Sequence, residues 1–211
     1  MTDQGRFITL EGVEGVGKST QAGLVAELLL SRGLRVIRTR EPGGVPLAED
    51  IRSLLLRTDG AAVHPMAELL LMFAARAAHW NDLIRPALQR GDWVVCDRFT
   101  DASVAYQGGG RGLPREFIAA LARAVHGDRV PDLTLLLDAP PEAVRSRLQL
   151  READRFEGES AAFFARVRAT YLDLARASPE RIRVIDASRP LATVSGEIAG
   201  IIAGLISKKS H

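Results

Sequence analysis

Short apolar runs alternate along this chain with longer stretches in which apolar residues recur at helical spacing. The apolar runs predict five strands, around residues 6–10, 34–39, 93–97, 133–138 and 181–186. The periodic stretches predict helices over residues 20–30, 47–56, 66–88, 114–125, 141–150, 161–177 and 191–206. Pro86 is expected to kink the third of these helices or to mark a join. The alternation predicts an α/β fold, with a five-stranded parallel sheet and helices on both faces, formed by residues 1–211 as a single domain.

The composition narrows the class of protein without defining a function. Of the 211 residues, 46% are hydrophobic and 26% charged, and the formal net charge is +2, as is ordinary for a soluble globular protein. The arginines are scattered among acids and no lysine-rich run is present, so we expect no nucleic-acid partner. A polar N-terminus, the lack of a bilayer-length apolar run, and one cysteine, Cys96, expected in the core, favour a cytoplasmic protein without a membrane partner.

The clearest chemical signal lies between the first predicted strand and the first predicted helix. Its spacing fits G-x-x-x-x-G-K-[ST], in the sequence Gly12-Val13-Glu14-Gly15-Val16-Gly17-Lys18-Ser19-Thr20. The glycines allow several backbone N–H groups to point at one anion, and the following helix adds its positive N-terminal end. Lys18 can reach the β- and γ-phosphates, and the Ser19 hydroxyl can ligate Mg²⁺. The sequence therefore predicts a binding site for a nucleoside triphosphate.

Charged residues follow the predicted strands at their carboxyl ends, where open α/β sheets bind ligands. Asp97 is the first candidate for a carboxylate on the Mg²⁺ side, and Asp138, which no cation follows, is the second. Arg98, next to Asp97, can hold a phosphate through two hydrogen bonds. The charged loop Arg40-Glu41-Pro42-Gly43-Gly44 either borders the same site or is a solvated turn, and its residues alone favour neither interpretation.

Three further stretches carry polar groups in unusual positions. Arg76 follows an apolar helix face, one turn after Met72 and Phe73. In the stretch 101–112, Ser103, Tyr106 and Gln107 can hydrogen-bond a base and a sugar, while the triple glycine 108–110 allows close backbone approach or a flexible turn. The charge-dense segment 147–159 is either a solvated linker or a mobile lid that brings arginines over the phosphates.

These features favour a kinase among phosphate-loop proteins, because the guanine-reading Asn-Lys-x-Asp of switch GTPases is missing and motor or transport ATPase domains are usually larger. The chain resembles the thymidylate kinases along nearly its whole length. The resemblance rests on residues 11–20, Arg40-Glu41-Pro42-Gly43-Gly44, Phe73-Ala74-Ala75-Arg76, Asp97-Arg98, Tyr106-Gln107-Gly108-Gly109-Gly110-Arg111-Gly112 and Pro131-Asp132-Leu133-Thr134. It implies a P-loop nucleoside monophosphate kinase fold, a homodimer, and Mg²⁺-dependent phosphorylation of dTMP to dTDP by ATP, in dTTP synthesis. A deoxynucleoside kinase or another nucleotide kinase on the same scaffold is the alternative.

The resemblance also implies roles for individual residues. On the donor side, Lys18 would bind ATP phosphates, with Ser19 and Asp97 on the metal side. On the acceptor side, Arg98 would grip the dTMP phosphate and Glu14 the 3′-hydroxyl. The remaining acceptor contacts would come from Arg40 and Pro42 at the border, Arg76 at the thymine carbonyl, Ser103 and Gln107 at the base, and Tyr106 crowding the sugar where ribose has its 2′-hydroxyl.

The sequence departs from the family pattern at two places. Many members carry a stacking Phe four residues before the helix arginine, where this chain has Met72; Phe73 comes one residue later, so either residue is a candidate for the thymine contact. The phosphate loop has no arginine between Glu14 and Lys18, so the catalytic arginine is expected in the lid. The candidates there are Arg147, Arg151 and Arg155, and the sequence does not separate them.

Overall fold

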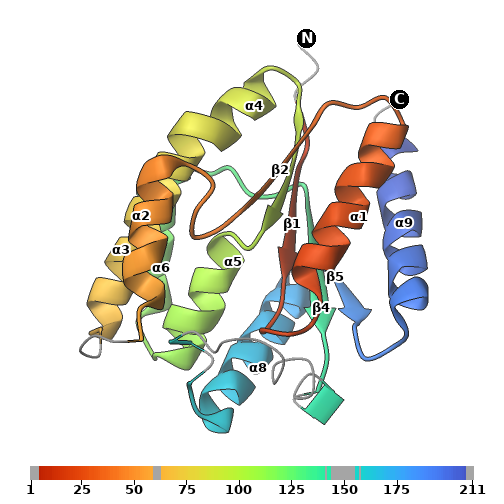
Figure 1. Cartoon of the computed structure of the whole chain (residues 1–211). Coiled ribbons are helices and arrows are strands. Elements are labelled where there is room, and N and C mark those ends of the chain that lie inside the picture. Colours follow the sequence, from red (N-terminus) through yellow and green to blue (C-terminus); the bar gives the residue numbers. More distant parts are fainter. Residues whose placement is uncertain (1–4, 59–62, 141, 144–154, 157, 208–211) are drawn as a thin grey trace.

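The computed structural model describes residues 5–58, 63–140, 142–143, 155–156 and 158–207. All five predicted strands are present and pair in parallel as one sheet, in the order β2-β3-β1-β4-β5 (Figure 1). The strands are β1 (Phe7–Glu11), β2 (Val36–Arg40), β3 (Trp93–Asp97), β4 (Leu133–Asp138) and β5 (Ile182–Asp186). The predicted α/β class is therefore confirmed. Because β1 lies between β3 and β4, the loop that follows it opens at the middle of the sheet.

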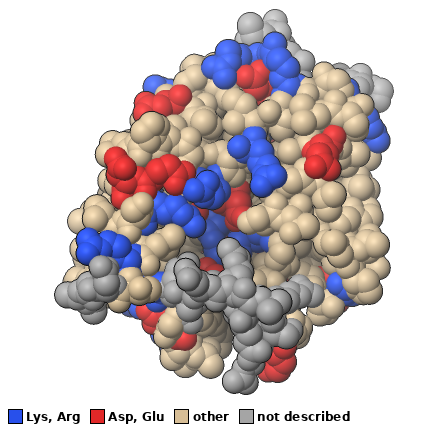
Figure 2. Space-filling model, in the orientation of Figure 1, with Lys and Arg blue, Asp and Glu red and all other residues tan. Residues whose placement is uncertain are grey.

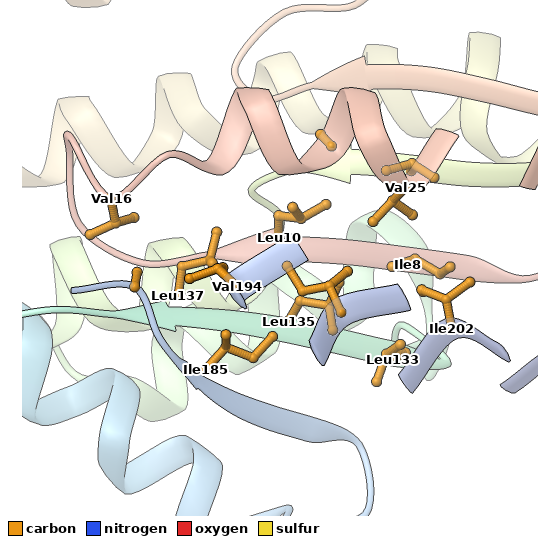
Figure 3. Packing of buried hydrophobic residues seen from close by; sticks show 14 of the residues in the cluster. Ile8, Leu10, Val16, Val25, Leu133, Leu135, Leu137, Ile185, Val194 and Ile202 are labelled. Carbon is orange, nitrogen blue, oxygen red and sulfur yellow. The ribbon is translucent and has the colours of Figure 1, made fainter. Parts of the chain in front are cut away.

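Two helices cover one face of the sheet, α1 (Lys18–Ser31) and α9 (Leu191–Ser207) (Figure 1). Alternate residues of β1 and β4 point toward these helices, and Figure 3 shows Leu10 and Leu135 packed close to Val25 and Val194. Each fully buried side chain of this kind contributes about 1.5–3 kcal/mol. The packing holds β1 and α1 firmly on either side of the loop that joins them.

The other face is covered by α8 (Ala161–Ala177), by α4 (Arg85–Gln89) and by the helical turn before α4. There Phe7 and Val94 pack with Trp80 and Phe99, and Cys96 is buried among them, as expected for a core cysteine. Beyond this layer lie α2 (Pro46–Leu56), α3 (Pro65–His79) and α6 (Arg115–His126), which Figure 1 shows side by side.

The helix predicted over residues 66–88 is interrupted. A wider π-helical turn, η1 (Trp80–Ile84), separates α3 from α4. It comes just before Pro86, which lacks an N–H and whose ring would clash with the carbonyl four residues earlier in a regular helix. The predicted join is therefore confirmed, and the helical break precedes the proline.

The polar stretch 101–112 is helical over most of its length. It forms a short helix, α5 (Thr100–Ser103), followed by a π-helical segment, η2 (Val104–Gly110). A Cβ on Gly109 would lie 2.1 Å from Thr170 Oγ1, and one on Gly110 would lie 2.4 Å from Phe163 Cε2. The glycines thus allow η2 to pack directly on α8, which excludes the flexible turn. The helix predicted over 141–150 and the segment 147–154 lie almost wholly outside the described residues.

Candidate functional site

A cavity of about 340 Å³ opens at the carboxyl ends of β1, β2 and β3. Figure 2 shows basic and acidic side chains gathered together in a hollow in the middle of one face of the molecule. Most of the residues predicted for the site line this cavity: Glu14, Gly15, Gly17, Lys18, Ser19, Thr20, Arg40, Pro42, Met72, Arg76, Asp97, Arg98, Ser103, Tyr106 and Gln107. Residues predicted from stretches nearly 100 positions apart are therefore brought together.

In the phosphate loop, the Lys18 side chain folds back and hydrogen-bonds to the loop's own backbone. Lys18 Nζ donates to the carbonyl oxygens of Gly12 and Val13, at 3.1 and 2.7 Å. Gly12 has φ 133°, and a Cβ there would lie 2.3 Å from the Leu137 carbonyl oxygen, so only glycine fits between β1 and β4. Val16 is buried in the core and anchors the loop from below. Burial, and then the charge of Arg98, lower the pKa of Lys18 to about 8; the negative charge of a bound phosphate would raise this pKa.

Arg98 joins the loop to the rest of the site. It is the only residue other than glycine with positive φ, 73°, among the described residues. Its guanidinium donates to Gly12 O at 2.9 Å and to Glu14 Oε1 at 2.7 Å, and lies 4.9 Å from the centre of the Tyr106 ring. Tyr106 in turn donates to Glu14 Oε2 at 2.5 Å. A strained backbone held by several contacts is typical of functional positions.

A second network supports Arg98 from beneath. The Tyr171 hydroxyl lies 3.3 Å from Arg98 Nη1 and donates to Glu11 Oε2 at 2.7 Å, while the Phe99 N–H donates to Glu11 Oε1 at 2.8 Å. Burial, followed by the charge of Asp101, raises the pKa of Glu11 to about 8 although Arg98 opposes the shift. In the sequence, Glu11 belongs to the stretch 11–20 that carries the family resemblance, and its position at the end of a buried strand is the only local signal of its role.

The two carboxylates considered for the metal side have different surroundings. The Ser19 hydroxyl donates to Asp97 Oδ2 at 2.8 Å, and both side chains line the cavity. Asp138 is instead held by Arg168, with two hydrogen bonds of 2.7 and 2.8 Å. Within the described residues no cluster of three or more His, Cys, Asp or Glu side chains is arranged to hold a metal. Ser19 and Asp97 supply hard oxygen atoms, which suits Mg²⁺ bound mainly through nucleotide phosphates and water.

The opposite end of the cavity is built around a buried ion pair. Arg76 Nε donates to Glu41 Oε2 at 2.7 Å, and His79 Nδ1 lies 3.1 Å from Glu41 Oε1. Burial acts to raise the pKa of Glu41, but Arg76 and His79 outweigh it and the pKa is lowered. Arg76 Nη2 donates to the Phe99 carbonyl, whereas its Nη1 is buried with no hydrogen-bond partner among the described residues.

Met72 and Phe73, the two candidates for the base contact, lie on different sides of helix α3. Met72 lines the cavity, one turn before Arg76. Phe73 points away into a cluster with Leu69 and Ile118, where its ring lies 4.6 Å from the Arg76 guanidinium carbon. Phe73 is therefore in position to support Arg76 from behind and not to stack on a ligand.

Of the three arginines predicted for the lid, Arg147 and Arg151 lie outside the described residues. Arg155 is described and does not line the cavity. Its guanidinium donates to the Leu55 carbonyl at 2.8 Å and to Glu68 at 2.9 Å, and stacks at 4.6 Å on the ring of Phe156. In this arrangement the Arg155 guanidinium contacts, among the described residues, only groups outside the phosphate loop.

Sequence reasoning missed five residues of the lining: Glu41, Arg52, Leu56, Ala102 and Phe156. Arg52 Nη1 donates to the Pro42 carbonyl at 3.0 Å, which fixes the Arg40–Pro42 loop at the cavity edge. Nothing in an amphipathic helix distinguishes such an arginine from a solvated one. Phe156 had a signal, since it is the lone aromatic residue of the charge-dense segment.

The phosphate loop, Arg98 and the buried pair of Arg76 and Glu41 thus line one cavity. This fold and site define the class of phosphate-loop kinases that act on small nucleotides. The comparisons specify the family. The family model described as thymidylate kinase matches residues 10–198. The chain belongs to the thymidylate kinase family.

Curated relatives and a solved structure agree with this assignment. A thymidylate kinase of Methylococcus capsulatus is 56% identical over 204 residues, covering 96% of this chain and 97% of the relative. One from Chromohalobacter salexigens is 59% identical over 200 residues, covering 92% and 93%. The crystal structure of thymidylate kinase from Ehrlichia chaffeensis matches with a TM-score of 0.77 and 34% identity, over 95% of this chain and 99% of that one.

Proposed function

We propose that this chain transfers the γ-phosphoryl group of ATP to the phosphate of dTMP, giving ADP and dTDP for dTTP synthesis. One observation carries the proposal: a single cavity is lined by the phosphate loop, by Arg98, and by Arg76 and Gln107. The two substrates can therefore meet with their phosphates side by side. Membership of the thymidylate kinase family supports the identity of the acceptor.

The donor is ATP, held by the loop formed by residues 12–20. Its backbone N–H groups and the N-terminus of α1 favour the phosphates, and Lys18 adds a positive charge. The Ser19 hydroxyl and the Asp97 carboxylate would hold Mg²⁺, which would neutralise phosphate charge. The hydrogen bond between these two side chains shows that their oxygens already converge, 2.8 Å apart.

The acceptor is dTMP, with its phosphate on Arg98 and its base at the buried end of the cavity. Glu14 is positioned for the 3′-hydroxyl, because Arg98 and Tyr106 hold its two oxygens on the cavity wall. Tyr106 crowds the sugar and so disfavours a ribose 2′-hydroxyl. The remaining contacts are Arg76 to the thymine carbonyl, Ser103 and Gln107 to the base, Met72 against the ring, and Arg40 and Pro42 at the border.

The chemistry is positioning and charge neutralisation. The attacking oxygen belongs to an already anionic phosphate, so no general base is required. Lys18 and Arg98 stabilise the charge on the transferring group from two sides. An arginine from the lid segment 147–159 completes this set. The candidates remain Arg147, Arg151 and Arg155, of which Arg155 is paired with Glu68 in this structure.

We also propose that residues 1–211 act as a single domain in a cytoplasmic homodimer, with no nucleic-acid partner. Exposed apolar side chains on α2, α3 and α6 support a dimer through these adjacent helices: Leu47, Leu54, Leu70 and Phe117 (Figure 1). No helix among the described residues is long and apolar enough to cross a membrane.

The direct test is ADP release with Mg-ATP and a panel of acceptors: dTMP, dUMP, thymidine, CMP and AMP. Strong stimulation by dTMP, well above that by dUMP, is the expected result. Stimulation by thymidine would instead assign a deoxynucleoside kinase. Hydrolysis that needs no acceptor would overturn the assignment of the acceptor end of the cavity.

A further inference from the structure

One carboxylate outside the cavity holds several of the residues that shape its buried end. Glu68, near the start of α3, is fully buried. Its Oε1 accepts from Gln107 Nε2 at 2.8 Å and from Arg111 Nε at 3.3 Å, and its Oε2 accepts from Arg111 Nη2 at 3.0 Å and Arg155 Nη2 at 2.9 Å. Glu68 itself does not line the cavity. Its contacts therefore act on a ligand only through other residues.

The contact with Gln107 fixes which end of the amide is available to a ligand. An ionised carboxylate only accepts hydrogen bonds, so the Gln107 amide must turn its NH₂ group toward Glu68. Glu68 also forms ion pairs with the guanidinium groups of Arg111 and Arg155, so both of its oxygens face N–H donors. Gln107 is buried and lines the cavity, which leaves its carbonyl oxygen as the group presented to a base.

The other oxygen of Glu68 supports the wall of the cavity. Arg155, bound to Oε2, stacks on Phe156, and Phe156 lines the cavity with its ring edge-on to Tyr106 at 6.1 Å between centroids. The same carboxylate thus holds both the hydrogen-bonding group and the aromatic wall at this end of the site.

We propose that Glu68 is a positioning residue for acceptor specificity: it orients the Gln107 amide so that an acceptor oxygen meets the protonated ring nitrogen of a thymine or uracil base. Cytosine carries an unprotonated acceptor nitrogen at that position and is repelled. The proposal rests on the proposed function, because it assumes a pyrimidine nucleotide at this end of the cavity.

The sharpest test replaces Glu68 by an amide of the same shape. In Glu68→Gln, the oxygen of the new amide stays with Arg111 Nη2 and Arg155 Nη2, and its NH₂ group faces Gln107 at the cost of the longer, 3.3 Å contact with Arg111 Nε. Gln107 then reverses and presents its own NH₂ group to the base. We expect the ratio of kcat/KM for dTMP to that for dCMP to fall by about tenfold or more, mainly through KM, with the same trend in calorimetric binding of the two nucleotides.

A double variant provides the rescue. In Glu68→Gln/Gln107→Glu the carboxylate and the amide exchange places, so that the new amide on α3 donates to the new carboxylate on η2, which again presents an acceptor oxygen to the base. Preference for dTMP should return. Glu159→Gln is the matched control: Glu159 pairs with Arg111 at 2.6 Å in the same cluster but makes no contact with Gln107, and the ratio should stay unchanged.

The outcomes separate the two proposals. A wild-type enzyme that does not prefer dTMP would overturn the proposed function. A wild-type enzyme that prefers dTMP, with Glu68→Gln losing activity on dTMP and dCMP in equal proportion, would leave the function standing and overturn the role of Glu68. Failure of both the single and the double variant to fold would assign Glu68 a structural role alone and equally overturn the proposal.

Discussion

The two ends of the cavity use charged residues in opposite ways. At the phosphate end the cations donate to groups of the phosphate loop itself: Lys18 to the carbonyls of Gly12 and Val13, and Arg98 to Glu14. At the base end the polar groups are held by buried carboxylates: Arg76 by Glu41, which also lines the cavity, and Gln107 by Glu68, which does not. A ligand must replace contacts at the first end, whereas it meets prepared donors and acceptors at the second.

The difference has a physical reason. Phosphates are strongly charged and bind well to any dense set of donors, so the phosphate end needs strength more than selectivity. Bases differ by single hydrogen-bonding groups, and a site discriminates among them only if its own groups cannot rotate to suit the wrong one. We therefore expect binding strength and acceptor choice to be separable in this molecule, and substitutions at each end test this expectation.

The largest effect is expected at the phosphate end. Arg98→Ala removes the cation between the two substrates, so kcat/KM should fall by about 10³-fold for every acceptor alike, with kcat carrying most of the loss. Steady-state kinetics with dTMP and dUMP measure it, and circular dichroism checks the fold. Arg183→Ala, an exposed arginine on β5, is the control. Turnover near the wild-type rate would remove Arg98 from the mechanism.

A smaller and selective effect is expected at the base end. Arg76→Lys keeps a positive charge near Glu41 but lacks the planar, multiply donating guanidinium of a residue that lines the cavity. The KM for dTMP should rise about 10- to 100-fold, because one charge-assisted hydrogen bond is lost, while kcat changes little. An equal fall in kcat would mean that the two ends are not separable.

A structural feature can be predicted from this sequence when it depends on residues that are neighbours in the chain. The strands and the loop 12–17 depend on neighbouring residues, and the structure contains them within a few residues of the predicted limits. Asp97 and Arg98 could be found because a strand end is itself a local feature. The roles proposed for these residues stay predictions until the kinetic tests are made.

Other features depend on contacts between distant segments. Glu68 follows a proline at a helix start and looks like an ordinary first-turn acid, yet Gln107, Arg111 and Arg155 surround it. The orientation of Met72 and Phe73 depends on how α3 is rotated against α6, which no periodicity determines to within one residue. The close packing of the glycines of η2 on α8 is likewise invisible until both helices are placed.

The smallest predicted effect concerns stability and contrasts Glu11 under the phosphate end with Glu41 at the base end. The pKa of Glu41 is lowered, whereas that of Glu11 is raised to about 8 by burial and then by Asp101. The folded protein therefore favours the protonated form of Glu11. Its contribution to stability is fully present below the unfolded pKa of 4.5 and is lost as pH rises through about 8.

Glu11→Gln isolates this contribution, since the amide resembles the protonated acid at every pH. Relative to wild type, the variant should gain thermal stability as pH increases from about 5 to about 9, at about 2–4 °C in Tm for each kcal/mol of difference. Scanning calorimetry at several pH values measures the gain. Tyr171→Phe removes a hydrogen bond that lowers the pKa of Glu11. In that variant, the stability contributed by Glu11 should therefore be lost at a higher pH than in the wild type. A Tm difference between Glu11→Gln and wild type that is constant with pH would show that Glu11 is ionised throughout, and that the carboxylates at the two ends are alike.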